Sequence, residues 1–160
     1  MQAAIQFFKD ALHHEVRAAA FYNKAAEITR DDESRMLYIK LAGMEEGHTS
    51  SLVEKVKTAP CGKAFDVDAF VRELENEAAD AISPEHLSLI ETGSMRQVLE
   101  LAIQFENQAC QDYENLAREA TDFSVKSYCQ EAVKEERGHI RELSNLLNSL
   151  SMSEEDRPGL

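Results

Sequence analysis

The chain has 160 residues, of which 43% are apolar and 29% are charged, and its formal net charge is −13 at pH 7. This length and composition predict one globular domain that buries a core of its own. The excess of acid argues against nucleic acid and anionic membranes as partners, because both bind proteins through Lys and Arg.

Cysteine usage and the N-terminus indicate the compartment. The three cysteines, Cys61, Cys110 and Cys129, include no CxxC pair, which predicts a reducing compartment and no disulfide framework. It also predicts that this chain holds no rubredoxin-type or zinc-ribbon iron site. The N-terminus has no basic stretch followed by an apolar one, and no apolar run of about 18 residues occurs. We therefore expect a soluble, cytoplasmic protein that does not associate with membranes.

Residues 2–57 predict a helical hairpin. Apolar residues that recur at alternating spacings of three and four predict a long helix over residues 2–30. Asp31 and Asp32 mark a turn and offer an N-cap to a second helix, which continues to about Lys57. Positions on the apolar stripe of each helix, here called the seam, should point toward the partner helices. The seam consists of Ile5, Phe8, Leu12, Glu15, Ala19, Tyr22 and Ala26 in the first helix and Tyr38, Leu41, Glu45, His48, Leu52 and Val56 in the second.

Residues 58–93 predict a long connection that is partly helical. A proline, a cysteine and a glycine at residues 60–62 interrupt the helical pattern. The amphipathic stretch over residues 66–82 predicts one helix. The Ser-Pro pair and the glycine that bound residues 83–93 predict a second, shorter helix.

Residues 94–149 predict a second hairpin. Ser94 and Gln97 have the spacing of a capping box, which opens a helix that continues to about Ala120. Asp122 offers an N-cap to the last long helix. The seam consists of Leu99, Ile103, Glu106, Cys110, Tyr113 and Ala117 in the third long helix and Cys129, Ala132, Glu136, His139, Leu143 and Leu147 in the fourth.

The two hairpins repeat one constellation of polar seam residues. Each contains a Glu-x-x-His motif, whose carboxylate and imidazole lie one turn apart on the same face of a helix. The first motif precedes the second by 91 positions (136 − 45), and the same offset relates a seam Glu and a seam Tyr upstream of each motif. The four pairs are Glu15 and Glu106, Tyr22 and Tyr113, Glu45 and Glu136, and His48 and His139.

The distances of these residues from the turns predict how they meet. Measured from turns near residues 31 and 122, each upstream Glu lies level with the Glu-x-x-His motif of the same hairpin. Two hairpins packed antiparallel would bring all six Glu and His side chains to one height. We therefore expect an all-α, ferritin-like four-helix bundle with one long crossover. The predicted parts are a bundle over residues 1–150, made of hairpins 2–57 and 94–149 and the crossover 58–93, and a flexible tail over residues 151–160.

Carboxylates at these seam positions predict a metal centre. Four of them would repel one another, and each would be costly to bury unpaired. Two divalent cations balance four carboxylate charges, and neutral imidazoles complete the coordination shells. One Glu on each of two helices with Glu-x-x-His on each of the other two is the arrangement of di-iron carboxylate bundles, and imidazole with carboxylate suits Fe or Mn. A duplicated fold that has lost its metal and a single structural zinc are the alternatives.

On this motif set and on the four helices over residues 2–150, the chain resembles the ferritin-like superfamily and, within it, the rubrerythrin-like di-iron carboxylate proteins. The resemblance implies a non-haem pair of iron ions, Fe²⁺ or Fe³⁺ with an oxo or hydroxo bridge, for which Mn or Zn can substitute. The implied roles are Glu45 and Glu136 as bridges, Glu15 with His48 at one ion, and Glu106 with His139 at the other. Tyr22 and Tyr113 match tyrosines that hydrogen-bond the carboxylates, and a purely core-filling role is the alternative.

The sequence departs from rubrerythrins in two respects and from bacterioferritin in one. Rubrerythrins have an additional Glu one turn after the third-helix ligand, where this chain has Ala109, with Ala18 as its counterpart in the first hairpin. They also carry a rubredoxin domain that supplies electrons, which is not found in these residues. The six-ligand set is closer to that of bacterioferritin. Bacterioferritin, however, has a haem-binding Met directly after the first bridging Glu, where this chain has Glu46, and we therefore expect no haem.

The resemblance implies an oxidoreductase that reduces hydrogen peroxide or dioxygen, with peroxidase or ferroxidase chemistry in defence against oxidative stress. Ala18 and Ala109 would leave room for a diatomic ligand, and re-reduction would need an external donor such as a rubredoxin-like protein or a flavoprotein. The alternatives are an iron-storage or iron-handling protein and a structural bundle with a silent metal site. The bulk of the crossover argues against a storage shell and favours a small oligomer, which we expect to be a homodimer.

Overall fold

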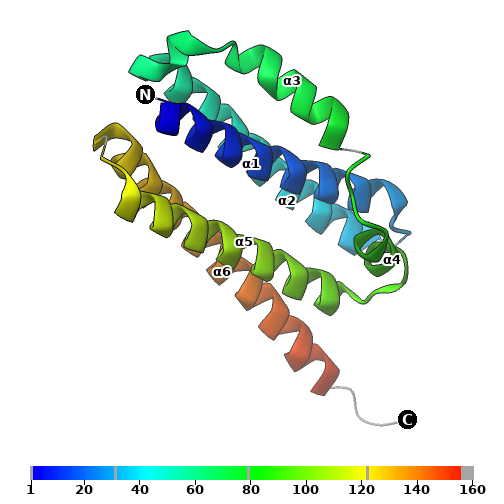
Figure 1. Cartoon of the computed structure of the whole chain (residues 1–160). Coiled ribbons are helices and arrows are strands. Elements are labelled where there is room, and N and C mark those ends of the chain that lie inside the picture. Colours follow the sequence, from blue (N-terminus) through cyan, green and yellow to red (C-terminus); the bar gives the residue numbers. More distant parts are fainter. Residues whose placement is uncertain (1, 31, 79, 122, 156–160) are drawn as a thin grey trace. The chain divides into compact units, whose positions relative to one another are not determined.

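The structure, a computed structural model, describes residues 2–30, 32–78, 80–121 and 123–155. These residues form six α-helices and one 3₁₀-helix and no strand, which confirms the predicted all-helical class. None of the described helices is long and apolar enough to cross a membrane. The chain divides into two compact units, Met1–Thr92 and Gly93–Leu160. The first contains one helical hairpin and the crossover helices, and the second contains the other hairpin (Figure 1).

The first hairpin consists of α1 (Gln2–Ile28) and α2 (Asp32–Thr58), which run antiparallel to each other (Figure 1). α1 was predicted over residues 2–30, and α2 was predicted to end near Lys57. The observed ends differ from these predictions by at most two residues. The guanidinium of Arg35 holds the turn between them. It donates to the carbonyl of Thr29 at 2.9 Å and to the carboxylate of Asp32 at 3.0 Å.

The seam of the first hairpin is buried at most of the predicted positions. Leu12, Leu52 and Val56 have no exposed surface, whereas Ile5 and Ala26 are half-buried. The apolar face of α1 is wider than the seam, because the crossover helices cover a second side of this helix. The additional buried residues of α1 are Phe7, Ala11, Val16, Ala18, Phe21 and Ala25.

The crossover forms η1 (Pro60–Ala64), α3 (Val67–Ala78) and α4 (Pro84–Thr92). Figure 1 shows α3 lying along α1. The buried residues of α3 are spaced by four, three and four positions, as expected of an amphipathic helix that packs one face: Val67, Val71, Leu74 and Ala78. α3 ends four residues before the predicted boundary at residue 82. The backbone N–H groups of Asp80 and Ala81 donate to the carbonyls of Glu77 and Ala78, three residues earlier, so the chain leaves the helix through tight turns.

Gly62 allows η1 to pack closely against the end of α2. A Cβ atom at this position would lie 1.8 Å from the carbonyl oxygen of Val56, so only glycine fits. The predicted interruption at residues 60–62 is thus confirmed, and it takes the form of a tight 3₁₀ turn.

The start of α4 also follows the sequence. The hydroxyl of Ser83 accepts a hydrogen bond from the backbone N–H of His86 at 3.2 Å, which makes Ser83 an N-cap before the helical Pro84. The ring of His86 then packs edge-on against Phe21 of α1, with ring centroids 5.5 Å apart. This contact attaches α4 to the first hairpin.

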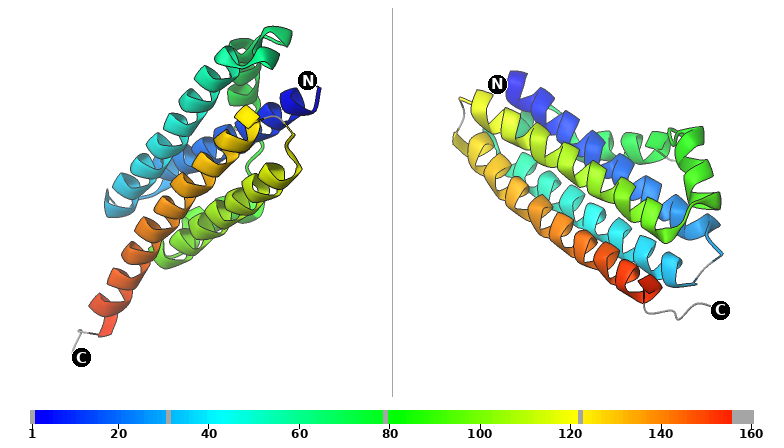
Figure 2. Two further views of the ribbon diagram at one scale, coloured as in Figure 1. Left: turned by 90° about the vertical axis from the view of Figure 1, so that its left-hand side faces the viewer. Right: turned by 90° about the horizontal axis from the view of Figure 1, so that it is seen from below.

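The second hairpin consists of α5 (Met95–Glu119) and α6 (Phe123–Glu155), which lie side by side in both views of Figure 2. The predicted capping box is confirmed at the start of α5. The hydroxyl of Ser94 accepts from the backbone N–H of Gln97 at 3.3 Å, and the backbone N–H of Ser94 donates to the Gln97 side chain at 2.9 Å.

α6 is longer than the sequence predicted. The helix was expected to end near residue 149, but it continues to Glu155, so the predicted end of this helix is too early. The flexibility of the tail over residues 151–160 stays a prediction. Between Gly138 and Pro158 the sequence has no glycine or proline that would end the helix. Two further predictions concern residues that lie outside the described ones. They are the tail over residues 156–160 and the N-caps at Asp31 and Asp122.

Two thiols lie in the core of the second hairpin. Cys110 and Cys129 are buried, and the thiol of Cys110 donates to the carbonyl of Val133 with an Sγ–O distance of 3.9 Å. Burial raises the pKa of both thiols to about 11. Both therefore stay protonated at neutral pH and act as small apolar residues, in agreement with their seam positions.

Candidate metal centre

Three predicted ligands of the first hairpin lie together. Glu15 belongs to α1, and Glu45 and His48 belong to α2, where a spacing of three places them on one face. The Nδ1 atom of His48 is 3.2 Å from a carboxylate oxygen of Glu15 and 3.4 Å from one of Glu45. Glu15 is 1% exposed and Glu45 is 3% exposed, while His48 is half-buried. One ligand atom of each residue lies within 4.8 Å of the other two, so the first hairpin gathers three donors by itself.

These donors fit a divalent first-row metal ion. Imidazole nitrogen and carboxylate oxygen bind such ions at about 2.0–2.2 Å, which places neighbouring ligand atoms about 2.8–3.6 Å apart in octahedral or tetrahedral geometry. Both distances from His48 to the carboxylates fall in this range. The 3.2 Å distance to Glu15 also suits a hydrogen bond. The arrangement can therefore hold either a proton or a cation between imidazole and carboxylate.

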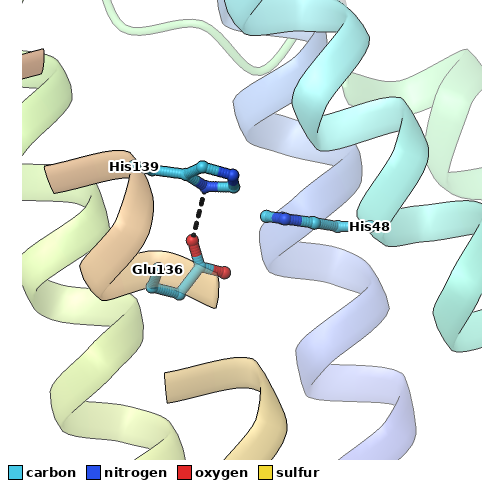
Figure 3. Close-up of side chains that lie close together, drawn as sticks. All are labelled: His48, Glu136 and His139. Atoms are coloured by element: carbon cyan, nitrogen blue, oxygen red, sulfur yellow. Dashed lines mark hydrogen bonds and ion pairs between the residues drawn. The ribbon is translucent and has the colours of Figure 1, made fainter. Parts of the chain in front are cut away.

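The second hairpin brings two of its three predicted ligands together. On α6, the Nδ1 atom of His139 lies 3.1 Å from a carboxylate oxygen of Glu136, a hydrogen-bonded pair that Figure 3 shows. Glu136 is 2% exposed, and Glu106 on α5 is 3% exposed. Among the described residues of this unit, however, no three donors lie within 4.8 Å of one another. Glu106 therefore does not form a three-donor group with Glu136 and His139, whereas Glu15 forms one with Glu45 and His48.

Tyr22 and Tyr113 fill the cores of their hairpins. Both side chains are buried. The ring of Tyr22 packs edge-on against Phe21 with centroids 5.3 Å apart, and the ring of Tyr113 packs edge-on against Tyr128 at 5.9 Å. These contacts account for the choice of an aromatic residue at each position, and a hydrogen bond from each hydroxyl to a ligand carboxylate stays a prediction.

A polar contact beside each motif joins the two helices of its hairpin. The side-chain amide of Asn23 donates to the carboxylate of Glu46 at 3.0 Å, and the guanidinium of Arg137 donates to the carboxylate of Glu114 at 2.6 Å. Neither contact was predicted from the sequence, although the offset of 91 relates Asn23 to Glu114 and Glu46 to Arg137. Following that offset through exposed positions would have found them. Because Glu46 and Arg137 directly follow the Glu of each motif, these contacts help to set the height of the motif against the partner helix.

No family model, curated protein or solved structure matches the chain. The assignment of a function therefore depends on the donor group in the first hairpin and on the internal repeat. Both are features of this chain alone.

Proposed function

We propose that the chain is a ferritin-like, non-haem di-iron protein of the rubrerythrin type, in which the two hairpins join in one four-helix bundle. The observation that carries this proposal is the group of Glu15, Glu45 and His48, whose donor atoms come from two helices and lie within reach of one ion. The repeat of 91 residues adds support, because it gives the second hairpin the same three residue types. Together these features match the di-iron carboxylate arrangement of four-helix bundles.

In this proposal, Glu15 and His48 would hold one ion and Glu106 and His139 the other, and Glu45 and Glu136 would each contribute a carboxylate to the pair. Four carboxylates then balance the charge of two ferrous ions, which removes the repulsion that their burial would otherwise cause.

A bound ferrous pair would supply the two electrons that reduce hydrogen peroxide to water, or begin the reduction of dioxygen. The chain's own residues would control access and protons. Ala18 and Ala109 are buried and lie one turn after Glu15 and Glu106, so their small side chains would leave room for a substrate of two heavy atoms. The Nδ1 atom of His48 would hold a proton against Glu15 until an ion takes that place. A rubredoxin-like protein or a flavoprotein would return the electrons.

Anaerobic loading with Fe²⁺ tests the proposal. We expect about two iron ions per chain, oxidised faster by one equivalent of hydrogen peroxide than by dioxygen, as followed by the near-ultraviolet absorption of the ferric product. Glu136→Gln should lower the iron content, whereas Glu135→Gln, which removes the same charge at an exposed neighbouring position, should leave it unchanged. Equal iron contents in the two variants, or substoichiometric iron in the unmodified chain, would contradict a di-iron centre.

The same experiment separates catalysis from storage. Iron uptake far beyond two ions per chain, with fast oxidation by dioxygen, would indicate an iron-storage protein that uses the same donors. Native mass spectrometry would then show a large shell instead of the small oligomer that the crossover favours.

A further inference from the structure

A groove of about 760 Å³ lies between α1, α2 and α3 of the first unit, and none of the six proposed metal ligands lines it. Its volume is within the range of small-molecule sites, about 300–1,000 Å³. The apolar residues of the lining are Val16, Ala19, Ala20, Val53 and Val71. A ligand in this groove would therefore lie on an aliphatic surface.

Carboxylates outnumber ammonium groups in the same lining by four to one. The acidic residues are Glu27, Glu46, Glu54 and Glu75, all of them exposed. The one lysine of the lining, Lys24, already pairs with Glu27 at 2.9 Å. These carboxylates belong to no group of three metal donors among the described residues. The groove is thus suited to an organic cation rather than to a bare metal ion.

Thr49 of α2 adds a buried polar group to the lining. The residue is 8% exposed, and its hydroxyl oxygen is buried without a hydrogen-bond partner among the described residues. Buried polar groups in folded proteins are nearly always satisfied by protein, water or ligand. Thr49 therefore points to an occupant that forms a hydrogen bond with this hydroxyl, and the acidic lining around it favours one that donates.

The acidic and apolar lining belongs to the first hairpin and is not a general property of the repeat. Ninety-one positions later, the charged positions 27, 46 and 54 become Arg118, Arg137 and Asn145. The apolar positions 16, 20 and 53 become Asn107, Gln111 and Ser144. The second hairpin therefore has neither the acidic nor the apolar residues at these positions. It also has no helix equivalent to α3 in the described residues.

We propose that this groove binds a linear aliphatic polyamine. The methylene groups of such a molecule would cover the Val and Ala side chains, while its ammonium groups pair with the carboxylates and one of them donates to Thr49. Glu46 and Glu54 are eight residues apart on α2, which is about 12 Å along the helix axis. An extended triamine such as spermidine spans that separation, whereas an amine with one charge reaches one carboxylate. The proposal is independent of the metal centre, because the two sets of residues do not overlap.

Titration of the purified chain with spermidine tests this site, with binding followed by calorimetry and by backbone amide chemical shifts. The test variant is Glu54→Gln/Glu75→Gln. The matched control is Glu73→Gln/Glu77→Gln, which removes the same charge from exposed residues of α3 outside the groove lining. We expect saturable binding of one spermidine with shifts in α1, α2 and α3. The affinity should fall about tenfold in the test variant and less than about twofold in the control.

Two further measurements probe the chemistry of the site. Thr49→Val should weaken spermidine binding about tenfold without loss of helix content, because an ammonium group loses its acceptor. Mg²⁺, which has charge but no apolar part, should not displace spermidine at equal concentration. The proposal is overturned if spermidine causes no saturable shifts in these helices, if both double variants weaken binding equally, or if Mg²⁺ displaces spermidine at equal concentration. Preferential occupation by a lysine-rich amphipathic peptide, at concentrations where spermidine does not bind, would also overturn it.

Discussion

The two hairpins carry the same donor residues, but they differ in what covers them. In the described residues, α1 and α2 pack against the crossover helices, whereas the second unit consists of α5 and α6. Val16 is buried in the first hairpin, and its counterpart Asn107 is exposed in the second. The internal repeat therefore retains residue types at the donor positions and changes them where the neighbouring element differs.

The donor positions themselves are not equivalent. In the first hairpin, the Nδ1 atom of His48 faces a carboxylate from each helix. In the second, His139 forms its hydrogen bond with Glu136 of its own helix. The first hairpin should therefore bind an ion without help, and the second should not.

The largest expected effect comes from removing the metal donors of one hairpin at a time. The double variant Glu45→Ala/His48→Ala removes two of the three donors of the first hairpin, whereas Glu136→Ala/His139→Ala leaves that group intact. We expect the first variant to lose iron binding, with an affinity lowered more than about 100-fold, and the second to retain about one ion per chain. Anaerobic equilibrium dialysis with Fe²⁺ measures this, and far-ultraviolet circular dichroism checks that both variants fold. Equal losses in the two variants would show that neither hairpin binds an ion by itself.

The next largest effect is expected from cavity-forming substitutions at matched buried positions of the two hairpins. Leu52 and its repeat counterpart Leu143 are 0% and 1% exposed. Replacing either by Ala should lower the free energy of unfolding by about 2–5 kcal/mol, because each change removes buried methyl groups and leaves a cavity. Urea denaturation measures this cost, and Leu146→Ala, at an exposed position of α6, should cost less than about 1 kcal/mol. A small cost at one leucine only would mean that the two seams are not packed equally.

A smaller effect tests the attachment of the crossover to the first hairpin. In Gly62→Ala the new methyl group would meet the carbonyl oxygen of Val56, so we expect the variant to be about 1–3 kcal/mol less stable in urea denaturation. Gly47→Ala is the matched control, because no heavy atom lies within 4 Å of its added Cβ. The control should be about 0.5–1 kcal/mol more stable, since alanine favours a helix interior. A neutral Gly62→Ala would show that η1 does not pack tightly on α2.

The parts of the fold that depend on local sequence were the predictable ones. The capping box at Ser94 and the Ser83 N-cap follow from short-range hydrogen bonding, and the seam follows from the helical period. The wide apolar face of α1 was visible in residues such as Phe7 and Phe21, but periodicity shows which face is buried and not what covers it. The donors Glu15, Glu45 and His48 were predictable because each sits on a seam. The difference between the two donor groups was not predictable, because the repeat gives both hairpins the same three residue types at the same spacing.

The smallest expected effect concerns the polar contacts beside the motifs. Arg137 and Glu114 form an ion pair, whereas their counterparts Glu46 and Asn23 form a hydrogen bond between a carboxylate and a neutral amide. The double variant Glu114→Asn/Arg137→Glu would give the second hairpin the contact of the first. Because the side chains of Arg137 and Glu114 are 61% and 42% exposed, we expect a change of about 0.2–1 kcal/mol in the free energy of unfolding at low salt. The difference should shrink at about 1 M salt, where the Debye length is about 3 Å. A difference that is independent of salt would mean that the aliphatic part of Arg137 holds the helices together by packing and that its charge contributes little.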